Sequence, residues 1–152
     1  MNILIIEDDD LKFGMVSDFL KSVIELANVV RASSYQAGIE SLVSGEFNIV
    51  VLDMTLPVSD LISSPVGTDF LTFGGELVLR ECARRKVKTR IMVVTQYNTF
   101  VRDNKEVSFD ELRDEIIHKY ADLVLGCVRL ERATDNWKSE IQKILVNEGF
   151  NN

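Results

Sequence analysis

Short apolar runs that end in acidic residues constrain the fold of this chain more than any other feature. Residues 3–6 read Ile-Leu-Ile-Ile and lead into the acidic residues 7–9, and residues 49–52 read Ile-Val-Val-Leu and lead into Asp53. An unbroken apolar run of this length is typical of a strand buried on both faces of a parallel sheet. Neighbouring strands lie about 4.8 Å apart, so two such strands would bring their terminal carboxylates within reach of one divalent cation.

Strand-like and helix-like segments alternate along the chain. The sequence predicts five strands, at residues 2–6, 29–32, 48–53, 90–95 and 122–128. Between them, apolar residues recur at spacings of three and four, as on one face of an amphipathic helix. The first predicted helix shows this spacing at Phe13, Val16, Phe19, Leu20, Val23 and Ile24. Strict alternation favours an α/β fold with a parallel sheet and crossover helices.

Polar residues at the predicted helix starts support this assignment, because their side chains can cap free backbone N–H groups. The capping positions are Asp9 or Asp10, Ser33 with Gln36, Ser108 with Glu111, and Thr134 or Asp135. Two connections, at residues 58–74 and 96–107, are long and polar. Loops of this length are often functional.

The composition fits one globular domain and excludes several classes of protein. The 152 residues are 46% hydrophobic, which is enough for a core, and the net charge of −7 argues against a general nucleic-acid binder. Cys82 and Cys127 lack the spacing of a metal site or a disulfide framework, and no apolar run is long enough to cross a membrane. We therefore expect a cytoplasmic protein with free thiols, no direct contact with nucleic acid and no membrane insertion.

The order of these motifs resembles the receiver domain of two-component response regulators. The resemblance rests on ILIIEDD at residues 3–9, VVLDMTLP at 50–57 and IMVVT at 91–95, and it extends over nearly the whole chain. It implies a three-layer flavodoxin-like (βα)5 fold with a five-stranded parallel sheet in the order 2-1-3-4-5. It also implies one receiver-like domain over residues 1–152, without an output domain.

By this resemblance, Asp53 accepts a phosphoryl group from a histidine kinase or a phosphotransfer protein. Glu7 and Asp8 correspond to the acidic pair that holds Mg²⁺, together with Asp53 and the backbone carbonyl of Thr55. Thr95 corresponds to the hydroxyl residue that hydrogen-bonds the phosphoryl oxygen. Phosphoryl transfer does need a nucleophile, a cation for the developing charge, and hydrogen-bond donors.

The resemblance also implies a signalling module rather than an enzyme. Such a domain would dock on a downstream protein partner through the surface of about residues 108–146, and a homodimer is a further option. The shift between two conformational states on phosphorylation would then be the signal.

The fifth predicted strand departs from the family pattern. Receivers normally end this strand with a lysine, usually before a proline, and here that position falls on or near Cys127. A phosphoryl group carries roughly two negative charges, so another cation would have to replace the lysine. The candidates are Arg129, Lys119 or a basic residue of the 96–107 connection.

Two other functions remain open. A phosphorylation-independent pseudo-receiver, acting as a protein interaction module, would explain the missing lysine but has no chemical need for Glu7, Asp8, Asp53 and Thr95 together. A phosphatase of the haloacid-dehalogenase type would form an aspartyl-phosphate on a related sheet. That family requires a second aspartate two residues after the nucleophile, where this chain has Thr55. Nucleotide binding is disfavoured because no glycine-rich phosphate loop follows the first strand.

Overall fold

A five-stranded parallel sheet forms the centre of the computed structural model, which describes residues 1–59 and 74–150. The sheet order is β2-β1-β3-β4-β7. Its strands are β1 (Asn2–Ile6), β2 (Asn28–Ala32), β3 (Ile49–Leu52), β4 (Arg90–Thr95) and β7 (Val124–Arg129). The helices are α1 (Asp10–Val23), α2 (Tyr35–Ser44), α3 (Gly74–Arg84), α4 (Phe109–Lys119) and α5 (Asn136–Asn147). The predicted α/β fold and strand order are confirmed, with β7 as the fifth strand of the sheet.

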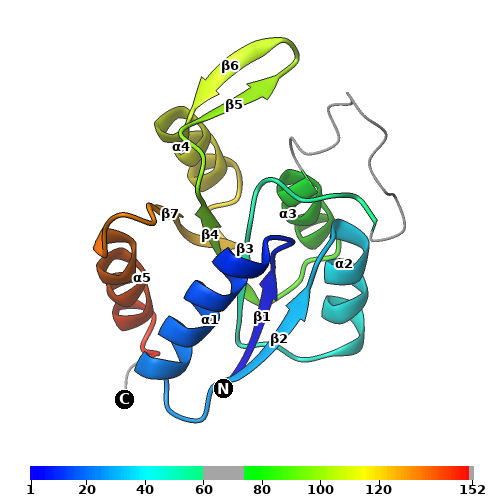
Figure 1. Ribbon diagram of the computed structural model, residues 1–152. Coiled ribbons are helices and arrows are strands. Elements are labelled where there is room, and N and C mark those ends of the chain that lie inside the picture. Colours follow the sequence, from blue (N-terminus) through cyan, green and yellow to red (C-terminus); the bar gives the residue numbers. More distant parts are fainter. Residues whose placement is uncertain (60–73, 151–152) are drawn as a thin grey trace.

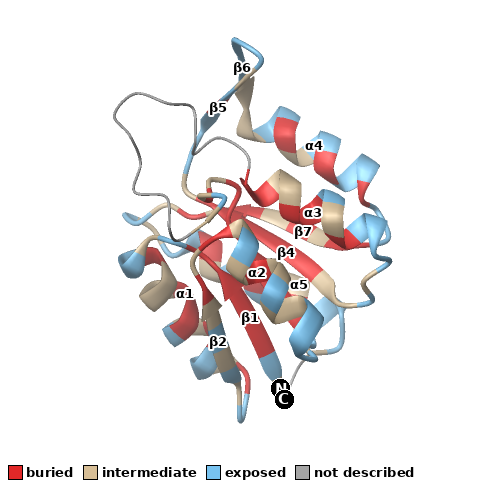
Figure 2. Cartoon of the chain, turned by 90° about the vertical axis from the view of Figure 1, so that its right-hand side faces the viewer, coloured by how far each residue is buried: buried red, intermediate tan, exposed pale blue. Residues whose placement is uncertain are grey.

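Two hydrophobic clusters on opposite faces of the sheet produce the three layers (Figure 1). Successive residues of a strand point to opposite faces, so Leu4 and Ile6 join one cluster while Ile3 and Ile5 join the other. Helices α2, α3 and α4 cover the first face, and α1 and α5 cover the second. The central strands are buried almost along their full length (Figure 2). Polar residues are therefore left to gather where these strands end.

Local capping fixes the starts of two helices where the sequence predicted. The side chain of Asp9 accepts the N–H of Lys12 and caps α1. Ser108 and Glu111 form a reciprocal capping box at the start of α4. Both caps satisfy N–H groups that the first turn of a helix cannot bond internally.

Helix α2 begins one residue later than the sequence predicted. Ser34, rather than Ser33, is the N-cap, and its hydroxyl accepts the N–H of Ala37. Either serine fits the local pattern, so tertiary contacts decide between them. The N–H groups of the next two residues donate to the carbonyls of residues 57 and 58, which lie beyond β3. The assignment of Ser33 with Gln36 as a capping box was wrong for this reason.

A β-hairpin interrupts the expected alternation. Strands β5 (Thr99–Arg102) and β6 (Lys105–Ser108) pair antiparallel within the connection that the sequence indicated as a long loop. Asp103 and Asn104 have φ angles of 49° and 61°, the left-handed backbone that a two-residue hairpin turn uses and that Asp and Asn tolerate. The hairpin extends away from the sheet (Figure 1).

Cys82 and Cys127 are free cysteines, as their spacing predicted. Among the described residues, no helix is both long and apolar enough to span a membrane. Most of the connection predicted at residues 58–74 lies outside the described residues.

Candidate functional site

The carboxylates of Glu7, Asp8 and Asp53 meet at the carboxyl edge of the sheet. Strands β1 and β3 are neighbours and pair Ile6 with Leu52, so the residues that follow the two strands lie side by side. One ligand oxygen from each of the three carboxylates lies within 4.8 Å of the others. Glu7 and Asp53 are buried, whereas Asp8 is exposed. The structure therefore brings these three predicted site residues into one cluster that reaches the solvent.

The carboxylate of Asp53 is oriented by its own loop. Its Oδ1 accepts the N–H of Met54 at 2.8 Å, and its Oδ2 accepts the hydroxyl of Thr55 at 2.9 Å. Its N–H donates to the carbonyl of Ile6 at 3.0 Å. These bonds hold the side chain in one direction although it follows the end of a strand.

A buried lysine from α1 completes the cluster. The Nζ of Lys12 lies 2.6 Å from Oε2 of Glu7 and 2.8 Å from Oδ1 of Asp53. The Lys12 side chain is only 1% exposed. Buried charges are tolerated when they are paired in this way. Lys12 therefore belongs to the site as closely as the carboxylates that it contacts.

Burial changes the acid–base properties of the cluster. Removal from water raises the pKa of Glu7 to about 7, the carboxylate of Asp53 adds to this rise, and Lys12 opposes it. The pKa of Asp8 is also raised, chiefly by partial burial. A cation bound among these groups would favour their ionised forms.

Thr95 ends β4, the strand next to β3, and is 1% exposed. Its hydroxyl has no hydrogen-bond partner among the described residues. A buried polar group without a partner typically costs about 1–3 kcal/mol. The contacts of the fold alone therefore do not explain a hydroxyl at this position.

A pocket of about 620 Å³ opens beside the acidic cluster. The three carboxylates and Thr55 line it together with Tyr97, which precedes the hairpin, and with Phe100 and Val101 of β5. The hairpin therefore adds an apolar wall to an otherwise acidic pocket.

Known proteins share this architecture. No family model matches the sequence. The chain is 28% identical over 146 residues to the Detocs response regulatory protein DtcB of Enterobacter cloacae (strain JD6301). This match covers 94% of this chain and 97% of that protein. It superposes on the signal receiver domain of a Luxo repressor protein from Vibrio parahaemolyticus with a TM-score of 0.63 and 18% identity, over 96% of this chain and 90% of that one. This chain has the receiver-domain fold.

A second solved structure of the same fold contains a metal ion. The response regulator protein TrrA from Thermotoga maritima, solved in complex with Mg²⁺ and BeF, matches with a TM-score of 0.61 and 19% identity. The match covers 95% of this chain and 98% of that chain. The metal and the fluoride belong to that protein, and its likeness to this chain is one of fold.

The fifth strand of the sheet, β7, ends one residue later than the sequence predicted. Strand β7 runs to Arg129, which pairs with Thr95, and Cys127 pairs with Val93 inside the sheet. A register shift between the two strands near Ile91 moves these pairs. The end of the strand, where receivers normally carry a lysine, therefore lies beyond Cys127.

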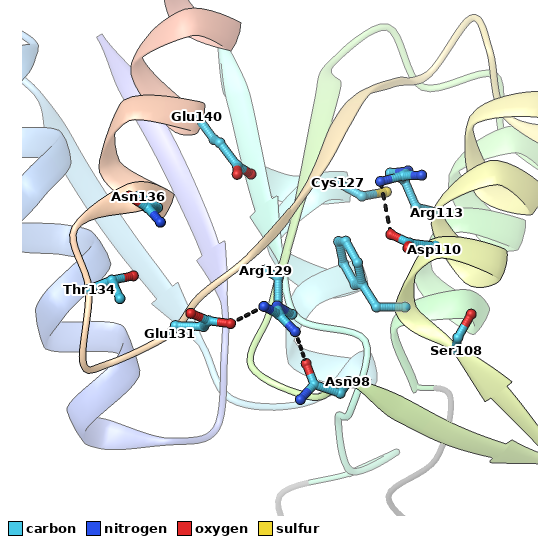
Figure 3. Close-up of a pocket in the computed structure, with 11 residues that line it drawn as sticks. Asn98, Ser108, Asp110, Arg113, Cys127, Arg129, Glu131, Thr134, Asn136 and Glu140 are labelled. Atoms are coloured by element: carbon cyan, nitrogen blue, oxygen red, sulfur yellow. Dashed lines mark hydrogen bonds and ion pairs between the residues drawn. The ribbon is translucent and has the colours of Figure 1, made fainter.

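Arg129 does not reach the acidic cluster. Its guanidinium pairs with Glu131 and donates to Asn98 in a separate pocket of about 380 Å³, lined by residues of α4, β7 and α5 (Figure 3). Two other candidate cations pair with acidic residues elsewhere, Lys119 with Glu76 and Arg102 with Glu115. The remaining candidate of the 96–107 connection, Lys105, is exposed at the start of β6. Lys12 is the lysine whose ammonium pairs with Glu7 and Asp53 in this cluster.

The sequence contained a signal for Lys12 that pointed to burial. Lys12, Val16 and Leu20 recur at intervals of four and all lie on the buried face of α1. A lysine on an apolar stripe requires a buried partner, and four acidic residues, at positions 7–10, precede it closely in the sequence. The helical spacing could not predict that the ammonium of Lys12 would also contact Asp53.

Arg31 of β2, a second residue that the sequence did not single out, orients the acidic loop. Its Nε donates to the carbonyl of Glu7 and its Nη2 to the carbonyl of Asp8, each at 3.0 Å. Its Nη1 bonds to the carboxylate of Asp10 at 2.7 Å. Because it bonds to backbone carbonyls of Glu7 and Asp8, Arg31 positions their loop without pairing with either side chain.

The donor set fits a hard divalent cation. Glu7, Asp8 and Asp53 offer only oxygen ligands, which Mg²⁺ prefers. Three carboxylates and the ammonium of Lys12 leave two net negative charges when all are ionised, and a divalent ion would balance them. Within residues 1–59 and 74–150, these three carboxylates form the group that could hold Mg²⁺.

Proposed function

We propose that this chain is a response regulator receiver domain that accepts a phosphoryl group on Asp53. The strongest support is that three carboxylates and the hydroxyl of Thr95, which has no hydrogen-bond partner in the described part of the chain, lie at one edge of a receiver-fold sheet. A domain that only docks on a partner has no chemical need for this set. Phosphoryl transfer uses each member of it.

In the proposed reaction, the donor is a phosphohistidine of a histidine kinase or a phosphotransfer protein. A carboxylate oxygen of Asp53 forms a bond to phosphorus while the bond from phosphorus to the histidine nitrogen breaks, and the electron pair leaves with that nitrogen. Met54 and Thr55 hold the carboxylate in position, and the hydroxyl of Thr95 donates to a phosphoryl oxygen. Mg²⁺, held by the three carboxylates and the backbone carbonyl of Thr55, would neutralise the charge of the transferring group.

The phosphorylated domain would signal by docking on a partner protein. The face formed by α4, β7 and α5 carries the pocket around Arg129, so it offers a recessed surface for such a partner (Figure 3). Phosphorylation would shift the population between two arrangements of this face, and the partner would bind one of them.

Labelling with a small phosphodonor tests this function. The wild-type protein and Asp53→Asn are incubated with phosphoramidate and Mg²⁺, and the intact mass of each is followed. We expect a phosphoryl adduct on the wild-type protein alone, and only when Mg²⁺ is present. Beryllofluoride with Mg²⁺ should also change the emission of Trp137, the single tryptophan, which is buried in α5. An unlabelled wild-type protein, or equal labelling of Asp53→Asn, contradicts the function.

A pseudo-receiver is the second candidate, and one observation favours it. Lys12 already pairs with Glu7 and Asp53, so part of the charge in the cluster is balanced without any ligand. A protein interaction module of this kind would take no phosphoryl label and would bind its partner equally well with Asp53→Asn. The labelling experiment therefore separates the two candidates.

A further inference from the structure

We propose that Lys12 supplies, from α1, the positive charge that pairs with the phosphoryl group on Asp53. This inference rests on the proposed phosphoacceptor function and identifies the cation that the fifth strand lacks. It assigns to a helix a role that a strand-ending lysine has in the resembled family.

Direct contact with the acceptor is the first argument. The Nζ of Lys12 lies 2.8 Å from Oδ1 of Asp53, the same oxygen that accepts the N–H of Met54. Among the ion pairs of the described residues, Lys12 is the cation in contact with Asp53. Only 1% of the Lys12 side chain is exposed, so this contact is shielded from solvent.

The position of Lys12 within its helix is the second argument. It lies in the first turn of α1, two residues after Asp10, at the end of the helix where the backbone dipole disfavours a positive charge. Burial of an ammonium group adds a further cost. Neither the helix dipole nor the burial of the side chain therefore favours a lysine at this position. Its ion pairs with Glu7 and Asp53 do favour it.

The number of donors on the ammonium is the third argument. The Nζ of Lys12 lies within ion-pair distance of one carboxylate oxygen of Glu7 and one of Asp53, but it has no hydrogen-bond partner among the described residues. Because an ammonium group carries three N–H donors, at least one is available to a phosphoryl oxygen while the ion pair with Glu7 is kept. The ammonium of Lys12 approaches Asp53 from helix α1. The hydroxyl of Thr95 comes from β4, which lies next to β3 on the edge opposite β1.

The chemical step requires no proton from Lys12. With phosphoramidate as donor, an Asp53 oxygen bonds to phosphorus, the bond from phosphorus to nitrogen breaks, and ammonia leaves with the electron pair after taking up a proton from water. Lys12 stays protonated and stabilises the oxygens of the transferring group by its charge.

Three proteins test the role of Lys12: the wild type, Lys12→Met, and Lys21→Met. Lys21 is a matched control because it is an exposed lysine on the same helix. We expect phosphoramidate with Mg²⁺ to label Lys12→Met about 100-fold more slowly than the wild type, as when one preorganised donor to a developing charge is removed. Lys21→Met should be labelled at the wild-type rate.

Calorimetric titration of Mg²⁺ without a phosphodonor provides a readout that does not depend on labelling. Loss of the neighbouring positive charge should tighten Mg²⁺ binding by about tenfold in Lys12→Met and leave it unchanged in Lys21→Met. If the circular dichroism of Lys12→Met shows that it does not fold, Lys12→Arg replaces it. Its longer, planar head should change the lifetime of the adduct several-fold.

The outcomes separate this inference from the function on which it rests. If the wild type is labelled and Lys12→Met is labelled at the same rate, the role of Lys12 alone is overturned. The same holds if the adduct of Lys12→Arg has the same lifetime as that of the wild type. Unchanged Mg²⁺ affinity in Lys12→Met also counts against it. A wild-type protein that takes no label overturns the phosphoacceptor function, and the role of Lys12 with it.

Discussion

Thr95 carries a hydroxyl group that the described part of the fold leaves without a partner. In the unphosphorylated protein, Thr95→Val should therefore raise the free energy of unfolding by about 1 kcal/mol, because it removes an unsatisfied buried group. The same substitution should weaken the beryllofluoride complex, since a donor to the phosphoryl position is lost. Urea unfolding, with and without beryllofluoride and Mg²⁺, measures both effects.

Thr89 offers a matched control for this substitution. Its hydroxyl donates to the carbonyl of Phe47 at 3.1 Å, so Thr89→Val should lower the free energy of unfolding in both conditions. If Thr95→Val instead destabilises the unliganded protein, the hydroxyl of Thr95 is already used by the fold, and its assignment to the phosphoryl group loses its support.

Single residues also show how far the sequence could predict this site. The meeting of Glu7, Asp8 and Asp53 could be predicted because neighbouring parallel strands end at the same edge of a sheet. Lys12 could not be assigned in the same way, because its contact with Asp53 depends on how α1 lies over β1 and β3. A helical stripe indicates which residues are buried but not which side chains they meet.

Helix α3 begins with two glycines that lie against the loop carrying the acceptor. A Cβ on Gly75 would lie 2.4 Å from the carbonyl oxygen of Asp53, which is backbone and cannot move aside cheaply. Gly75→Ala should therefore lower the free energy of unfolding by about 1–3 kcal/mol, as overpacking does, and weaken Mg²⁺ binding because Asp53 is displaced. Thermal unfolding and Mg²⁺ titration measure the two effects.

Gly14 provides the opposite case on α1. A Cβ there would meet no atom within 4 Å, so Gly14→Ala should stabilise the protein by about 0.5–1 kcal/mol through better helix propensity. Equal effects of the two substitutions would show that helix propensity, rather than the approach of α3 to Asp53, governs Gly75.

Element boundaries were predictable where the local pattern is sharp and uncertain where it is not. The first and fourth predicted strands have the same ends as β1 and β4, because apolar runs end abruptly at polar residues. The hairpin of β5 and β6 was missed, since strands of four residues give too little alternation to stand out from a loop. The end of β7 was set too early because a register shift cannot be read from one strand alone.

For the molecule as a whole, Mg²⁺ binding should be linked to global stability. Cys82 is 1% exposed within the core, and burial raises the pKa of its thiol to about 11. In a Cys127→Ser background, a thiol reagent at pH 8 should therefore label Cys82 only when the protein unfolds. Mg²⁺ binding increases the ratio of folded to unfolded protein, and it should slow this labelling by the same factor.

Asp8→Asn is the control for this linkage. Asp8 is exposed, so its substitution should leave the fold intact while it removes one carboxylate from the cluster. Labelling of Cys82 should then lose most of its dependence on Mg²⁺. Slowing of equal size in Asp8→Asn, or by sodium at the same ionic strength, would place the effect of Mg²⁺ outside the cluster.

The location of Lys12 also bears on the order in which a nascent chain can assemble this site. Lys12 follows Glu7 by five positions, and Asp53 directly follows β3, so the buried carboxylates and their counter-charge all lie within residues 7–53 of the 152. A lysine at the end of β7 would leave these carboxylates unpaired until the last strand had been synthesised. With Lys12 the ion pairs need only β1, α1 and β3, and they can form while the ribosome is still translating the second half.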